Sequence, residues 1–199
     1  MAERGRPRSF DRTEALDRAM RVFWAKTYEG ASLTDLTRSM GINAPSLYAA
    51  FGSKERLFVE AVAHYAQAHG SEIWRALDEN LTIEEAVRQF LLLSAASFSR
   101  PDVPPGCLIV LGTQHDAGDA NVAHRELRAR RRANLVRIAA RFQRAIADGE
   151  LPPDFDFKGE AALLLSIQTG MSVLARDGAD RATLEAIAST ALRRWSSNG

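Results

Sequence analysis

The side chain with the greatest potential for covalent chemistry in this 199-residue protein is the thiol of Cys107, its single cysteine. Cys107 follows Pro104, Pro105 and Gly106 and opens a short apolar segment. A thiol becomes a nucleophile where a cation or a helix N-terminus lowers its pKa. In apolar surroundings a free cysteine usually packs as a small core residue. The sequence leaves both interpretations of Cys107 open.

The other chemically capable side chains form no recognisable catalytic or metal-binding set. The four histidines are His64, His69, His115 and His124. They lack the spacing of metal ligands, and no second cysteine is present to join them. Asp116 and Asp119 have no partner motif that would make them catalytic carboxylates. We therefore expect no metal, no cofactor and no enzymatic activity.

Basic residues are concentrated at the N-terminus and in one later helix. The formal net charge is only +1, so an affinity for nucleic acid must come from a local cluster. Residues 1–8 contain Arg4, Arg6 and Arg8 and are expected to form a basic arm that reaches phosphates or a minor groove. A second run comprises Arg128, Arg130, Arg131 and Arg132. We expect this run to be a solvated helix face.

Residues 32–51 have the pattern of two short helices joined by a tight turn. Ser32 and Asp35 form a capping box, and Leu33, Leu36 and Met40 share one helical face. Gly41 supplies the turn, and Asn43 caps the second helix, where Leu47 and Phe51 face the same core. The sequence therefore predicts a helix-turn-helix, a motif whose second helix enters a DNA major groove.

The outer face of the second helix is small and carries no charge. It comprises Ala44, Pro45, Ser46, Tyr48 and Ala49. Apolar side chains at the groove favour contact with thymine methyl groups over bidentate readout of guanine. Electrostatic affinity must then come from the N-terminal arginines and from Lys54.

The remaining pattern is helical throughout, so an all-α fold of about nine helices is predicted. Helices are expected over 11–26, 53–78, 82–99, 106–114, 121–147, 156–176 and 180–196. Gly70 predicts a break or bend in the helix over 53–78, which connects the N-terminal bundle (9–52) to the remainder (53–199). The last two helices carry enough apolar surface to predict self-association over 156–197.

The composition indicates the cellular compartment in which the protein works. A single cysteine excludes an internal disulfide framework and fits a reducing environment. The longest apolar run is too short to span a bilayer, and no signal peptide is recognised at the start. We expect a cytoplasmic protein that does not enter the membrane.

The segment from residue 6 to residue 65 resembles the TetR-type transcriptional regulators. The resemblance rests on SLTDLTRSMG, NAPSLYAAF and GSKERLF, and more loosely on PGCL, GELP and the final helical pair. It implies a homodimeric repressor that binds a double-stranded operator and is released by a small-molecule inducer. It also implies DNA contacts by Thr34, Asn43, Ala44, Pro45, Ser46, Tyr48 and Lys54. Some family members sense electrophiles through a cysteine in a similar context, which is an alternative role for Cys107.

The resemblance also locates a ligand-binding core and a dimer interface. Candidates for the lining of the ligand pocket are Phe90, Leu93, Ser97, Cys107, Phe142 and Gln168. Such an aromatic and aliphatic lining favours a mostly apolar ligand. Candidates for the dimer interface are Leu164, Gln168, Met171, Leu184, Ile187, Ala191 and Trp195.

Overall fold

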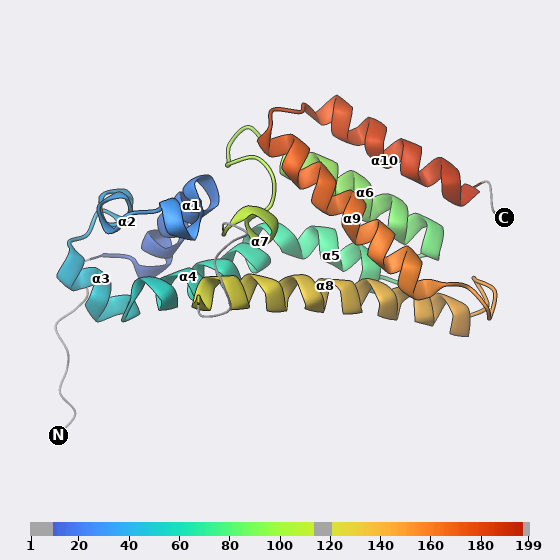
Figure 1. The fold of residues 1–199 in the computed structure, drawn as a ribbon, viewed down its shortest axis with the longest axis horizontal. Helices are drawn as coiled ribbons and strands as arrows, with labels where there is room; N and C mark the ends of the chain where they lie inside the picture. The colour runs from blue at the N-terminus through green and yellow to red at the C-terminus, as the bar shows by residue number, and fades with distance from the viewer. Residues whose placement is uncertain (1–9, 114–120, 197–199) are drawn as a thin grey trace, which may run out of the picture.

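A computed structural model describes residues 10–113 and 121–196, and all of its regular structure is helical (Figure 1). The helices are α1 (Arg12–Gly30), α2 (Leu33–Met40), α3 (Ala44–Phe51), α4 (Lys54–Tyr65), α5 (Ser71–Asp78), α6 (Ile83–Phe98), α7 (Leu108–Leu111), α8 (Val122–Ala147), α9 (Phe157–Arg176) and α10 (Arg181–Ser196). A π turn, η1 (Ala66–Gly70), joins α4 to α5. If α4, η1 and α5 are taken as one irregular helix, the described part of the chain contains nine helices, as predicted.

The irregularity expected at Gly70 is the π turn. Gly70 is buried, and a side chain at this position would lie close to the ring of Trp74. A π turn inserts one residue into the helix and changes the direction of its side chains. The helix that connects the two halves of the molecule is therefore irregular near its middle.

Side-chain caps begin most of the helices close to the predicted positions, whereas α5 and α7 have no side-chain cap. At α6, Thr82 accepts a hydrogen bond from the Glu85 backbone N–H at 3.3 Å. The Glu85 carboxylate does not complete a capping box, because it accepts hydrogen bonds from Arg88 and Gln89. At α1 the regular helix ends at Thr27, whose φ of 66° is unusual for a β-branched residue.

Two hydrophobic clusters make up the core. The first contains residues of α1, α2, α3, α4, α7 and the start of α8. Its largest members include Phe23, Trp24 and Phe58. The second lies among α5, α6, α8, α9 and α10 and includes Phe90 and Phe142. Cys107 packs against both clusters. The first cluster extends beyond residue 52, so α4 and α7 pack as parts of the N-terminal bundle.

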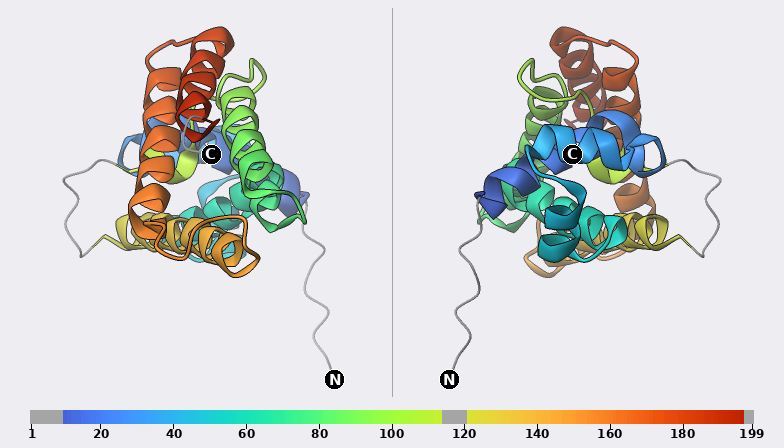
Figure 2. Two further views of the ribbon diagram at one scale, coloured as in Figure 1. Left: turned by 90° about the vertical axis from the view of Figure 1, so that its right-hand side faces the viewer. Right: turned by 90° about the vertical axis from the view of Figure 1, so that its left-hand side faces the viewer.

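The long axis of the molecule separates these two parts. In Figure 1, α1, α2 and α3 lie at one end, and α6, α9 and α10 lie at the other. Helix α8 runs along α4 and α5 beneath both parts. Figure 2 shows α6, α9 and α10 side by side on one flank of the second part. No helix in residues 10–113 or 121–196 is both long and apolar enough to span a membrane.

Candidate nucleic-acid interface and core cavity

The predicted helix-turn-helix is present, and its caps have the expected geometry. The Ser32 hydroxyl accepts from the Asp35 N–H at 3.0 Å, and the Asp35 carboxylate accepts from the Ser32 N–H at 3.1 Å. Gly41 ends α2 with a φ of 68°, a conformation that glycine adopts without steric cost. The side chain of Asn43 accepts from the Ser46 N–H at 2.8 Å and so starts α3.

Helix α3 is held from behind and exposed in front. Leu47 and Phe51 are buried in the first cluster. The exposed residues of this helix and its cap are Asn43, Ala44, Pro45, Tyr48 and Ala49, and Ser46 is half-buried. Thr34 is exposed on the preceding helix, α2. The motif therefore presents a narrow, uncharged ridge of the kind that fits a major groove.

One predicted inward residue points outward. Leu33 is 36% exposed, although its spacing from Leu36 and Met40 predicted a place on the buried face. It occupies the first position of α2, and the fully buried Ala31 fills the core just before this helix. Leu33 is therefore a surface residue of the motif.

Lys54 lies at the start of α4 and packs on an aromatic ring. Its Nζ atom is 4.5 Å from the ring centre of Tyr28. Partial burial lowers the pKa of the Lys54 amine. The Tyr28 hydroxyl donates to Glu55 at 3.0 Å, and burial together with this carboxylate raises the pKa of Tyr28 to about 12. These contacts attach α4 to the end of α1.

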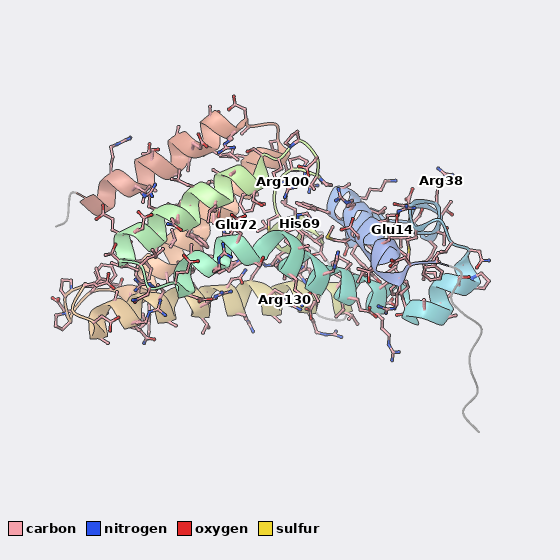
Figure 3. The ribbon with its side chains drawn as sticks, turned by 180° about the vertical axis from the view of Figure 1, so that it is seen from behind. Glu14, Arg38, His69, Glu72, Arg100 and Arg130 are labelled. Atoms are coloured by element: carbon pink, nitrogen blue, oxygen red, sulfur yellow. The ribbon has the colours of Figure 1, made fainter. Side chains whose placement is uncertain are left out.

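Two basic residues near the motif were missed by the sequence analysis. Arg38 is exposed on the last turn of α2, and Figure 3 shows it at the outer surface of the helix-turn-helix end. Arg56 is exposed on α4, and its guanidinium lies beside Gly52 at the end of α3. Their place next to the motif in sequence was the available signal. Arg4, Arg6, Arg8, His115, Asp116 and Asp119 lie outside the described residues.

A cavity of about 620 Å³ lies where the two hydrophobic clusters meet. Its walls come from α4, the π turn, α5, the end of α6, α7, α8 and α9. Its apolar lining is provided mainly by Ile73, Trp74, Phe98, Ile109, Val110 and Leu165. A pocket of this size accommodates a small organic molecule.

Two of the residues predicted to line a ligand pocket border this cavity, and their role in ligand binding stays a prediction. Cys107 and Gln168 line the cavity. Phe90 and Phe142 do not, because both are buried as packing residues of the second cluster. Leu93 and Ser97 are half-buried on α6 but also lie outside the cavity wall.

The surroundings of Cys107 favour the protonated thiol. Its backbone N–H donates to the Ser172 hydroxyl at 2.9 Å, which ties the start of α7 to α9. Burial raises the pKa of the Cys107 thiol and outweighs a hydrogen bond from Tyr65 and the charge of Arg131. Cys107 therefore faces the cavity as a neutral side chain.

The prediction that the basic run on α8 is simply a solvated face is wrong for Arg130 and Arg131. Both are half-buried and line the cavity. Arg130 pairs with Glu126 at 2.8 Å, and Arg131 donates to the Ile109 carbonyl oxygen at 2.8 Å. Arg132, one residue further, is exposed. Successive residues of a helix point in different directions, so neighbouring arginines of one run have different surroundings.

Hydrogen bonds connect the cavity region to the helix-turn-helix end. Arg176, on the last turn of α9, donates to the carbonyl oxygens of Trp24 at 2.7 Å and of Pro105 at 3.1 Å. The Gly112 carbonyl oxygen after α7 accepts from the Tyr28 N–H at 2.7 Å. The end of α1 is thus bonded both to α9 and to the segment after α7.

Several residues predicted at a dimer interface belong to the core of the subunit. Leu164, Met171 and Leu184 are buried in the second cluster, and the amide of Gln168 donates to Ser94 at 2.9 Å. Ile187 and Ala191 are half-buried and line a surface groove of about 590 Å³ between α9 and α10. The side chain of Trp195 lies outside the described residues. The outward face of α9 is instead formed by Leu163, Ile167, Gly170, Val173 and Leu174.

The histidines of the described ranges are used in packing. His64 approaches Asp17 at 3.3 Å, His69 stacks on Tyr65, and His124 is buried. Within residues 10–113 and 121–196, no cluster of three histidine, cysteine or acidic side chains is arranged to hold a metal ion.

Comparison with known proteins bears on the motif and on the whole chain. The family model of bacterial regulatory proteins of the tetR family matches residues 15–61, which include α2, α3 and the start of α4. The repressor ComR of Escherichia coli K12 is 36% identical, over 96% of this chain and 92% of its own length. The chain belongs to the TetR family.

Other TetR-family proteins agree in sequence and in fold. The repressor BdcR of E. coli K12 is 30% identical, over 87% of this chain and 83% of its own. A structure of the TetR regulator CifR, a cysteine mutant complexed with 26-bp operator DNA, has 43% identity and a TM-score of 0.91. That alignment covers 96% of this chain and all (100%) of the CifR chain.

Proposed function

We propose that this TetR-family DNA-binding transcriptional regulator is a homodimeric repressor, released from a two-fold symmetric operator by a small molecule. The observation that carries the proposal is the exposed ridge of α3, which Leu47 and Phe51 anchor from behind. The similarity to CifR, whose structure was determined in complex with operator DNA, supports it across the whole fold. Two copies of α3 would enter successive major grooves about 34 Å apart or somewhat further.

The DNA contacts divide between base edges and phosphates. Ala44 and Pro45 would approach thymine methyl groups, and Ser46 a base edge or a phosphate. Asn43, Thr34, Tyr48 and Lys54 are proposed to contact the DNA around them. Arg38 and Arg56 are added as phosphate contacts because both are exposed beside the motif. The N-terminal arginines would supply much of the salt-dependent affinity.

The second copy is proposed to pack on α9 and α10. Val173 and Leu174 are 40% and 43% exposed, which is unusual for large aliphatic side chains of one helix face. Gly170 lies between Ile167 and Leu174 on that face, and a β-carbon added to it would meet no atom of a neighbouring element within 4 Å. The adjacent apolar groove includes Leu163, Ile167 and Ile187. Pairing two such faces would bury them in a four-helix interface.

Selection of DNA from a random pool tests the operator proposal. The full chain should enrich an inverted repeat, because two identical α3 helices read identical half-sites. Tyr48→Phe keeps the exposed ring but removes its hydroxyl, so it should weaken binding to all enriched sequences by a similar factor. Enrichment of a single, asymmetric site, or of no sequence at all, would contradict the proposal.

A second candidate is a covalent sensor in which Cys107 reacts with an electrophile. The observation in its favour is the position of Cys107 on the cavity wall, within hydrogen-bonding reach of Tyr65. The raised pKa of the buried thiol opposes it, because the thiolate is the reactive form.

Cys107→Ser separates the two candidates with little change in side-chain volume. A reversible inducer should release the serine variant from DNA as it releases the unaltered protein. An electrophile should add the mass of its adduct to the unaltered protein only, as intact-mass spectrometry would show. Loss of every response in the serine variant, together with such an adduct, would favour the covalent candidate.

A further inference from the structure

The described wall of the cavity carries arginines but no acidic side chain. Arg130, Arg131 and Arg137 line it from α8, with Asn134 between them. The opposite walls contribute neutral polar groups such as Gln67 and Thr169, and the apolar side chains already named. A cavity with positive charge on one wall and apolar surface elsewhere favours ligands that have a negatively charged group at one end and an apolar remainder.

Two of these arginines are neutralised within the protein. Arg130 pairs with Glu126 at 2.8 Å. Arg137 forms an ion pair with Asp78 and also donates to the Trp74 carbonyl oxygen at 3.2 Å. Their positive charges are therefore largely compensated before any ligand arrives.

Arg131 differs from its neighbours. Its hydrogen bond is to a neutral acceptor, the Ile109 carbonyl oxygen, and the ion pairs within the described ranges do not include it. Partial burial and the neighbouring charge of Arg128 both lower the pKa of Arg131. A guanidinium nevertheless remains charged at neutral pH. A partly desolvated cation on a cavity wall, without a carboxylate partner, is stabilised by a bound anion.

We propose that the cavity binds an amphipathic organic anion, with its carboxylate or similar head group on Arg131 and its apolar body against Trp74, Phe98 and Leu165. This inference rests on the proposed function, because it gives the chemical class of the inducer. It revises the expectation of a mostly apolar ligand, which was based on Phe90 and Phe142. The uncompensated charge of Arg131 disfavours a cationic ligand.

The position of Arg131 also explains how a bound anion could affect the DNA-binding end of the molecule. Arg131 holds the Ile109 carbonyl oxygen of α7, and the Gly112 carbonyl oxygen after α7 holds the Tyr28 N–H. A carboxylate on Arg131 competes with the bond to Ile109, because a charge-assisted hydrogen bond is stronger than one to a neutral carbonyl. Loss of that bond would free α7 from α8, and the remaining bond from the Tyr28 N–H to Gly112 would carry a movement of α7 to the end of α1.

Calorimetric titration of the full chain without DNA tests the head-group preference. The probes are hexanoate, octanoate and decanoate, with 1-octanol and octylamine as matched neutral and cationic ligands. Octanoate should bind about tenfold tighter than 1-octanol, since one hydrogen bond to a charged group is worth about that factor. Arg131→Gln should abolish the difference. Arg132→Gln, which removes an exposed charge one residue away, should preserve it.

The outcomes distinguish this inference from the proposed function. Equal binding of octanoate and 1-octanol, no binding of any carboxylate, or a preference unchanged in Arg131→Gln would overturn it. Operator binding is measured separately on the same variants. If the protein binds its operator but shows no preference for carboxylates, the repressor proposal stands and the organic-anion proposal is wrong. Carboxylate binding through Arg131 that leaves the operator complex intact would support the site and contradict its role in release.

Discussion

Replacing Gly170 with glutamate is expected to convert the proposed homodimer into monomers and to weaken operator binding by about 100-fold or more, because one linked half-site is lost. Gly170 lies at the centre of the outward face of α9, where a β-carbon would have open space around it. Within one subunit the change should not destabilise α9, since glutamate favours a helix more than glycine does. Between two subunits it would bury a charge in an apolar interface.

Sedimentation analysis and operator titration check this prediction together. Val136→Glu is the matched control, because Val136 is 67% exposed on α8, away from the proposed interface. The control should remain dimeric and bind DNA normally. If Gly170→Glu is still a dimer with full operator affinity, the partner does not pack on this face of α9.

Removal of residues 1–8 is the second change with a large expected effect. Three arginines leave with this segment. If each contacts a phosphate, the slope of log affinity against log salt should fall by about 3 per subunit, and affinity at low salt should fall by about 100-fold or more. The measurement is operator binding over a series of salt concentrations.

A matched variant separates the effect of the arginine charges from the effect of shortening the chain. Replacing Arg4, Arg6 and Arg8 together by glutamine should reproduce most of the loss caused by the deletion, because it removes the three guanidinium charges and keeps the chain length. Arg132→Gln should leave the salt dependence unchanged, since Arg132 is exposed on α8, outside the helix-turn-helix end. An unaltered slope after the deletion would show that the arm does not contact phosphates.

The sequence by itself determined the parts of this protein that depend on neighbouring residues. Ser32, Asp35, Gly41 and Asn43 specify caps and a turn through contacts that span at most four residues. The separation of Leu47 from Phe51 specifies one buried side of α3, so its exposed face followed as well. Helical periodicity and capping were therefore sufficient to predict the motif and the order of the helices.

Only the tertiary structure decided which apolar face of α9 turns inward. Two of its faces are rich in aliphatic residues, and periodicity cannot choose between them. Packing against α6 and α8 buried Leu164 and Met171 and left Leu174 exposed. The same packing placed Arg131 on the cavity wall and sent Phe90 and Phe142 into the core. These positions depend on contacts between residues distant in sequence, which set the chemistry of the cavity and of the proposed partner surface.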